Sequence, residues 1–510
     1  MKKGCLMKKF LPFLSLLLLL GGACQAAALD TDRSFLNAQK EQDKVLGGAF
    51  MSMLSDRDSE KAKFTLMTTP FYSRTFDGIK LGQYFGSVGS NVVTLKKTPK
   101  AGNAELSYDS VFRDTTVVPG GPIAAGASAG AIAGSQAAIR LEPWQKSVGA
   151  HFAVSVQFGE GFESFSVAIN TAVVQNTTNL QSSFINDLAY NNPLVAVAPS
   201  TFADYLAGNG SSAYQAALTS AKIDGKSHET VRTSDIDVQV RYAITDEEKE
   251  ALTVFADLLI PTGNKPSGEF LLEPIAGNHS WFVGAGARGR VQLYSPSTSS
   301  GLPGDDSDDS RNVWLAGDVL YRYGLTSTQI RVPDIQNTVW GKYRLTVTAA
   351  QPAIAALTSQ FVPAANALVQ KFKVTPRSTF MTNLRVCMTY KKTAAEFGYQ
   401  VCHKQEEANH FDTPWVDNAI YLIAPAYSPA ISAAANIALA TPTATPINHD
   451  NLQLNHPAQT FHTFFGSVGM TGDVDAVSWA FALGGAVNFS NEARVAPRSW
   501  DGFVKVGIAF

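Results

Sequence analysis

The most constraining feature of this 510-residue chain is a recurring segment of about ten residues in which apolar and polar side chains alternate. A period of two places alternate side chains on opposite faces of a β-strand. In residues 147–158, Phe152 and Val156 share the apolar face, whereas His151 lies on the polar face. Residues 477–489 repeat the pattern. The chain is therefore predicted to be all-β, with strands that have one apolar and one polar environment.

Composition and the placement of aromatic residues indicate which all-β fold this is. Charged residues make up 16% of the chain, whereas soluble globular proteins carry about 25%. Phe152 and Phe158 lie near opposite ends of one predicted strand, as do Trp479 and Phe489 of another. Two aromatic girdles at the membrane interfaces are typical of a transmembrane β-barrel. A barrel is therefore favoured over a soluble β-sandwich.

The N-terminus is predicted to direct export. Lys2, Lys3, Lys8 and Lys9 precede an apolar run over residues 10–20, which is too short for the ~20 residues of a membrane-spanning helix. We expect residues 1–28 to be a secretory signal peptide and residues 29–62 to form a partly helical periplasmic segment before a barrel over residues 63–510. Cys24 leaves lipoprotein processing open as an alternative.

The last strand is the most specific motif in the sequence. Trp500, Val504 and Phe510 lie on one face, Lys505 lies on the other, and the sequence ends on the aromatic residue. This pattern resembles the C-terminal signature of bacterial outer-membrane β-barrel proteins. The resemblance implies an integral protein of the Gram-negative outer membrane, with lipid and the barrel-assembly machinery as partners and Phe510 as the assembly signal. It indicates the class and no particular family.

The alternating segments predict an antiparallel up-and-down barrel of about 14 strands, within 12 to 16. The candidate strands are residues 64–76 or 88–97, 104–113, 135–142, 147–158, 162–174, 234–244, 250–260, 281–294, 313–323, 378–391, 396–405, 460–471, 476–489 and 500–510. With both termini in the periplasm, the long connections 175–233, 324–377 and 406–459 fall outside, whereas 114–134 and 295–312 are long and periplasmic. Residues 202–222 and 352–372 are predicted to be partly helical, either folded into the mouth as a constriction or packed on its outer rim.

Charged side chains on the predicted strands must face the lumen, because Arg or Lys on the lipid face costs about 2–4 kcal/mol near the midplane. Such charges could line an open pore with weak anion preference, or could pair across a filled barrel. The candidate lumen residues are Arg241, Arg288, Arg290, Arg322, Arg385, Lys404, Lys505, Asp235, Asp237, Asp257, Asp318 and Asp501.

Two cysteines remain beyond the signal peptide, Cys387 and Cys402. A turn over residues 393–396 would place them directly opposite each other on the lumen face, where a cross-strand disulfide or two reduced thiols could result.

The sequence leaves three functions open. The first is a porin-like channel for passive diffusion of small hydrophilic solutes. The second is a barrel transporter for hydrophobic compounds of the fatty-acid type, which residues 260–263 faintly resemble. The third is a structural or adhesive surface protein. We expect no enzymatic activity, because the eight His residues form no convergent catalytic set, and we expect no metal, cofactor or nucleic-acid partner. The oligomeric state is open, a trimer being one option.

We predict that deletion of Phe510 will leave the protein exported but not assembled. The last strand would lose the aromatic residue with which the assembly machinery is expected to interact. Fractionation should place the variant in the periplasm without a heat-modifiable band. Normal outer-membrane levels of a heat-modifiable barrel would contradict the prediction.

Overall fold

The computed structural model describes residues 44, 64–86, 90–96, 105–107, 111, 136–158, 162, 164–186, 201–209, 215–247, 249–295, 311–336, 338–348, 361–422, 445–475, 477–490 and 497–510. The predicted signal peptide and the N-terminal segment lie outside these residues, apart from Lys44. Among the described residues, none of the helices is long and apolar enough to cross a membrane.

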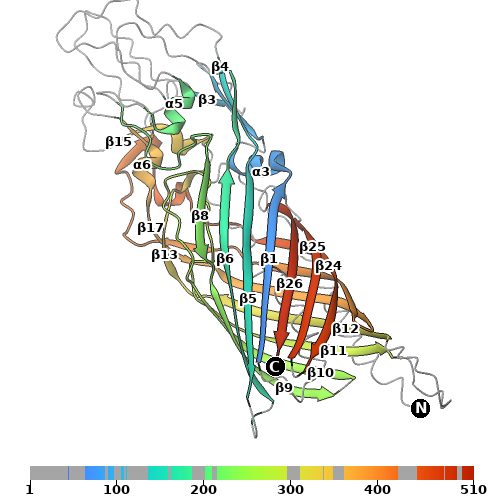
Figure 1. Cartoon of the computed structure of the whole chain (residues 1–510). Coiled ribbons are helices and arrows are strands. Elements are labelled where there is room, and N and C mark those ends of the chain that lie inside the picture. Colours follow the sequence, from blue (N-terminus) through green and yellow to red (C-terminus); the bar gives the residue numbers. More distant parts are fainter. Residues whose placement is uncertain are drawn as a thin grey trace, which may run out of the picture.

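Twelve antiparallel strands form one closed barrel (Figure 1). Each strand pairs with the next strand of the barrel, and β26 pairs with β1 to close the ring. The barrel strands are β1 (Phe64–Phe76), β5 (Trp144–Gln157), β6 (Phe165–Asn179), β9 (Ile236–Glu247), β10 (Glu250–Ile260), β11 (Phe282–Tyr294), β12 (Arg311–Gly324), β18 (Arg377–Tyr390), β19 (Thr393–Lys404), β24 (Gln459–Val474), β25 (Val477–Ser490) and β26 (Arg498–Ala509). The fold class is confirmed, and the strand count is the lower limit of the predicted range.

Two predicted barrel strands belong elsewhere. Residues 104–113 and 135–142 contribute β3 (Glu105–Ser107) and β4 (Gln136–Leu141) to a separate four-stranded sheet. Their alternation reflects a half-buried sheet instead of a lipid-facing strand, because one face of β4 packs into an apolar core. The barrel continues directly from β1 to β5.

All connections at one end of the barrel are short turns, apart from residues 295–310 between β11 and β12. This turn end also holds the closure, where the amides and carbonyls of Phe64 and Phe510 exchange hydrogen bonds of 3.0 Å. The long connections leave the other end, which we call the loop end. Because β1 pairs with β5, the connection between these strands begins and ends at the loop end. Residues 114–134, which were predicted to be periplasmic, lie outside the described residues.

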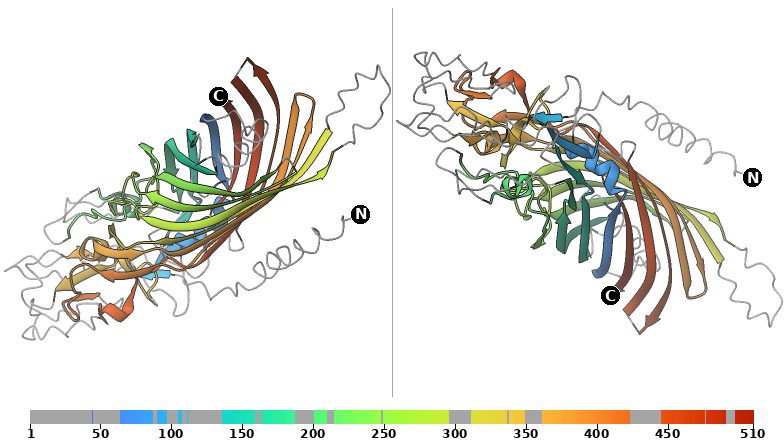
Figure 2. Two further views of the ribbon diagram at one scale, coloured as in Figure 1. Left: turned by 90° about the horizontal axis from the view of Figure 1, so that it is seen from below. Right: turned by 90° about the horizontal axis from the view of Figure 1, so that it is seen from above.

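The loop-end connections fold together into a compact outer cap beyond the barrel (Figures 1 and 2). A single apolar core collects side chains from the β1–β5, β6–β9, β10–β11 and β12–β18 connections. Trp340 is fully buried there and donates its indole N–H to the Phe85 carbonyl at 2.9 Å, while the Tyr343 hydroxyl donates to the Ala221 carbonyl at 2.8 Å. The cap is therefore stabilised by contacts between connections that are distant in sequence.

The cap contains several small sheets and short helices. The strands are β2 (Val92–Lys96), β3, β4 and β7 (Ser182–Asn186) in one sheet; β13 (Ser327–Arg331), β17 (Gln370–Thr375) and β20 (Ala408–Phe411) in another; β16 (Val362–Pro363), β15 (Leu345–Thr348), β21 (Ile420–Leu422) and β22 (Thr445–Pro446) in a third; and the pair β14 (Asp334–Ile335) and β23 (Leu452–Gln453). The helices are α3 (Gly78–Phe85), α5 (Phe202–Ala207), α6 (Ala364–Leu368), and the 3₁₀ turns η2 (Gly341–Tyr343) and η4 (His449–Asn451). β8 (Ser227–Thr233) pairs with the upper part of β6 above the barrel.

The predicted helical segments pack in this cap and do not constrict the lumen in the described part. Phe202, Tyr205 and Leu206 of α5 are buried in the cap core, and Ala364 and Leu368 of α6 lie in a second apolar cluster. Residues 352–360 lie outside the described residues.

The predicted pairing of Cys387 with Cys402 is wrong, and neither cysteine forms a disulfide. The turn occupies residues 391–392, so Cys387 lies opposite Glu396 and Cys402 lies opposite Met381. The turn was predicted at residues 393–396, which is too late in the sequence. The predicted and the observed registers put the cysteines on the same face, so alternation could not distinguish them. Six residues along β19 separate Cys402 from the position opposite Cys387, about 20 Å at the usual rise of a strand.

This register predicts a specific crosslink. In a Cys387→Ser background, Met381→Cys should be bridged to Cys402 by a short thiol reagent, because the two positions are direct partners. The native pair should remain uncrosslinked under the same conditions. Mobility on non-reducing gels measures both, and a crosslink between Cys387 and Cys402 in the native protein would contradict the register.

Candidate functional site: the lumen and its outer mouth

The outward surface of the barrel is apolar, whereas the inward surface carries the charges. Leu66, Phe152, Leu483 and Val506 are 36–56% exposed and lie on the outer face. Aromatic residues mark both ends of the strands, as Trp281 and Tyr294 do beside β11, at 46% and 54% exposure. This outer surface suits lipid acyl chains flanked by two interfaces.

Three charge clusters occupy the inward face. In the first, Arg322 of β12 binds Asp257 of β10 through Nε at 2.6 Å and Nη2 at 2.9 Å, and Asp237 of β9 through Nη2 at 3.0 Å. Gln239 donates to Asp257 at 3.2 Å and accepts two hydrogen bonds from Arg241. The first cluster therefore joins β9, β10 and β12 across the barrel wall.

The second cluster is centred on Asp318 of β12. Its carboxylate accepts from Arg288 at 2.5 Å, from Arg385 at 2.9 Å and from Asn383 at 2.8 Å. Arg385 is 1% exposed, so its charge depends on this carboxylate for compensation.

The third cluster joins Lys505, a predicted lumen residue, to Glu396, which was not predicted to face the lumen. Lys505 of β26 donates to Glu396 of β19 at 2.7 Å, and Ser467 of β24 donates to the same carboxylate oxygen at 2.8 Å. Glu396 was predicted to lie in the turn over residues 393–396. A turn at residues 391–392 would have placed it on the lumen face with Gln400 and Lys404.

Polar residues also form one row around most of the wall. Direct cross-strand partners run from β11 through seven further strands to β1, and each contributes a charged or polar side chain. The row consists of Arg288, Asp318, Asn383, Gln400, Thr463, Asn488, Ser499 and Thr75. These eight residues form a continuous hydrophilic row across eight adjacent strands, which we call the polar belt.

Aromatic rings also line the inward face of the barrel. Phe255, Phe465 and Phe503 face inward, and each ring lies against a glycine of a neighbouring strand. A Cβ at Gly398 would lie 2.4 Å from the Phe465 ring, and one at Gly484 would lie 2.3 Å from the Phe503 ring. The glycines let these large rings lie flat on the wall.

The connection between β10 and β11 enters the mouth of the barrel. Ala276 packs with the inward residues Phe71, Val174 and Phe465. The Asn176 side chain donates to the Ile275 carbonyl at 2.8 Å, and the Asp235 carboxylate accepts from the Asn278 amide at 2.5 Å.

Gly277 must be glycine for this arrangement. Its φ is +82°, and a Cβ would lie 2.2 Å from an Asp235 carboxylate oxygen. Asp235 therefore anchors the inserted connection at the mouth, although the sequence analysis predicted that it lines the pore.

Two further predicted lumen residues lie near the barrel ends. Arg290 is 3.5 Å from Asp246, near the turn end, and its guanidinium lies 5.3 Å from the Trp314 ring centroid. Lys404 lies at the mouth with its Nζ 6.0 Å from the Phe461 ring centroid. Arg288 and Arg290 share a face as predicted, but each has an acidic neighbour, so they do not form an uncompensated positive patch.

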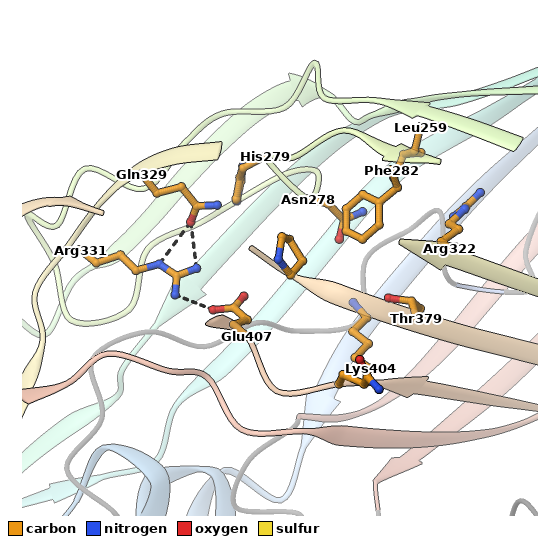
Figure 3. A pocket seen from close by; sticks show the side chains of 12 residues that line it. Leu259, Asn278, His279, Phe282, Arg322, Gln329, Arg331, Thr379, Lys404 and Glu407 are labelled. Carbon is orange, nitrogen blue, oxygen red and sulfur yellow. Dashed lines mark hydrogen bonds and ion pairs between the residues drawn. The ribbon is translucent and has the colours of Figure 1, made fainter. Parts of the chain in front are cut away.

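A cavity of about 500 Å³, including the part open to solvent, lies between the barrel mouth and the cap. Figure 3 shows Arg322 at one end of its lining and the Arg331–Glu407 pair at the other. Arg331 of β13 donates to Glu407 at 2.6 Å and to Gln329 at 2.9 and 3.2 Å. Burial raises the pKa of Glu407, but the charge and hydrogen bond of Arg331, together with His456 and Asn409, outweigh burial and lower the pKa below its usual value.

The barrel is closed, its outer face is apolar and its inner face carries the charges, as expected of a barrel that spans a lipid bilayer. The chain is an integral outer-membrane β-barrel protein. No family model matches the sequence, and no curated protein matches it. Among the described residues, none of the His, Cys, Asp and Glu side chains group in a way that could hold a metal ion.

Several solved barrels are similar in structure. An outer-membrane channel of Pseudomonas putida F1 is 9% identical, with a TM-score of 0.38 over 88% of this chain and 96% of that chain. The transport unit of the autotransporter AIDA-I of Escherichia coli is 7% identical, with a TM-score of 0.30 over 89% and 92% of the two chains. A FadL homologue of Pseudomonas aeruginosa is 10% identical, with a TM-score of 0.26 over 88% and 90%.

We predict that the cap becomes less stable in acid because of Glu407. Its pKa is lower in the folded state, so the stabilisation is complete above the unfolded value of about 4.3 and is lost as the pH falls through the folded value. Glu407→Gln should destabilise the cap at pH 7 by about 3 kcal/mol, because Arg331 stays buried without its counter-ion.

Urea unfolding of the cap in detergent, followed by tryptophan fluorescence, measures this prediction. Glu406→Gln, at the neighbouring position, is the matched control. Equal stability of the Glu407→Gln variant and the native protein at pH 7 would contradict it.

Proposed function

We propose that this protein is a channel for passive diffusion of small hydrophilic solutes across the outer membrane, and that it carries out no catalysis. The observation that carries the proposal is the polar belt from Arg288 to Thr75, which extends over eight adjacent strands of the wall. A path for hydrophilic solutes requires a polar wall of this kind.

The three clusters also indicate how selectivity would be set. Most inward charges are compensated within the wall, as Asp318 is by Arg288 and Arg385. Arg241 differs, because its hydrogen bonds go to the neutral Gln239 side chain. Among the described residues, Asp237, Asp257 and Asp318 lie within electrostatic reach of Arg241 but accept no hydrogen bond from it. Its charge is therefore compensated only at a distance, and we infer a weak preference for anions.

A transporter for hydrophobic compounds is the second candidate. The observation that favours it is the apolar cluster in the lumen, where Phe71, Phe465 and Phe503 meet Ala276 of the inserted connection. That connection begins at Ile260–Gly263, the residues with a faint resemblance to fatty-acid transporters. On β1, β24 and β26 the belt residues Thr75, Thr463 and Ser499 lie nearer the loop end than this cluster. A hydrophobic solute entering from the cap would therefore have to pass polar side chains before it reached the cluster.

Liposome swelling separates the two candidates. Purified protein should admit small sugars at a rate that falls with their size. Uptake of a long-chain fatty acid without sugar permeation would favour the second candidate.

The selectivity proposal is tested with a charge reversal. Arg241→Glu should shift the reversal potential in a salt gradient towards cations, because a base facing the lumen is replaced by an acid. The matched control is the double variant Arg290→Gln, Asp246→Asn, which removes one charge of each sign from the pair near the turn end and should leave the reversal potential near that of the native channel. A shift in the control alone, with none in Arg241→Glu, would contradict the assignment.

A further inference from the structure

We propose that the lumen contains a binding site for a primary ammonium group, formed by Asp501 and Ser73, and that Lys44 occupies this site within the chain. As a statement about solutes, it rests on the channel function proposed above. Solutes that carry a primary amine would be recognised at this position.

The site is built from two adjacent strands and one residue from outside the wall. Asp501 of β26 and Ser73 of β1 are direct cross-strand partners, and they are 3% and 4% exposed. The Lys44 ammonium donates to the Asp501 carboxylate at 3.1 Å and to the Ser73 hydroxyl at 3.1 Å. The Asn488 side chain donates to the other carboxylate oxygen and orients the group.

Asp501 differs from its neighbours in the source of its counter-ion. Asp318 is compensated by Arg288 and Arg385, and Glu396 by Lys505, all of which belong to barrel strands. The ammonium at Asp501 instead comes from a residue 457 positions earlier, which is not part of the barrel. The Asp501 side chain is 1% exposed, and a buried carboxylate is costly to leave without a counter-ion. Asp501 therefore requires a cation, and the cation that contacts it is Lys44, which does not belong to a barrel strand.

The geometry suits an ammonium group better than a guanidinium group. An ammonium is a compact charge with three donors, whereas a guanidinium requires acceptors in one plane. Here one carboxylate oxygen and one hydroxyl oxygen lie at equal distances from a single nitrogen. The His151 ring of β5 is tilted against the Phe71 ring, with 5.0 Å between the ring centroids, and lies within electrostatic reach of both Lys44 and Asp501.

Lys44 then acts as an intramolecular competitor. A tethered group is present at a high effective concentration, so a free amine has to displace it before it can bind. Removal of the Lys44 side chain should leave the Asp501 site in place and open it to solutes.

The placement of Lys44 is tested by crosslinking. In a Cys387→Ser, Cys402→Ser background, Lys44→Cys should be joined to Ser73→Cys by a flexible bifunctional thiol reagent in isolated outer membranes. A reagent is needed because the contact is made by the end of the long Lys44 side chain, so the two backbones lie further apart than a direct disulfide would allow. The control pairs Lys44→Cys with Ser227→Cys, on β8 above the barrel, and should not crosslink. A heat-modifiable barrel without the Ser73 crosslink would overturn the proposal.

The ligand class is tested with n-butylammonium in planar bilayers. The conductance of Lys44→Ala should change at an n-butylammonium concentration about tenfold lower than that of the native protein, because the tethered competitor is gone. The conductance of Lys44→Ala combined with Asp501→Asn should not change at that concentration. Tetramethylammonium, which has the charge but no N–H donor, should have no effect on any variant.

The outcomes distinguish the two proposals. Conduction with equal responses to n-butylammonium in Lys44→Ala and in the double variant overturns the ammonium site and leaves the channel function standing. Absence of conduction in every variant counts against the channel function, and the crosslink then decides by itself whether Lys44 occupies the lumen site.

Discussion

The structure depends on the pairing of its first and last barrel strands. Backbone N–H and C=O groups have no water to bind in the hydrocarbon core, so an open sheet edge is excluded there. The ten partner pairs between β1 and β26 remove both edges, and the Phe64–Phe510 hydrogen bonds complete the closure at the turn end. With the ring closed, alternation along every strand sorts side chains into lipid-facing and lumen-facing sets.

The lumen-facing set then has to accommodate charge in a confined space. Arg322, Arg385 and Lys505 are almost fully buried, and each binds a carboxylate of another strand. These pairs link strands that are not always direct neighbours, as Arg322 links β12 to β9. Charge compensation therefore both satisfies the lumen side chains and ties the wall together.

In the cap, at the loop end, contacts between distant segments again satisfy groups that would otherwise be left unpaired. Long connections would carry unsatisfied backbone and exposed apolar residues if they remained separate. Instead they share one core, in which Trp340 and Tyr343 of one connection bind carbonyls of two others. The β10–β11 connection extends this packing into the mouth, with Asp235 as its anchor.

The sequence by itself determined the twelve barrel strands, the sorting of their two faces and the class of membrane protein, but it also predicted two barrel strands, residues 104–113 and 135–142, that contribute to a separate sheet. These properties depend on local alternation and on the cost of charge in lipid, so Arg288, Asp318 and Arg385 could be assigned to the lumen directly. Only the tertiary structure decided which strands close the ring, that Cys387 opposes Glu396, and that Lys44 reaches Asp501. Those contacts join distant segments, and alternation is unchanged when a register moves by an even number of residues.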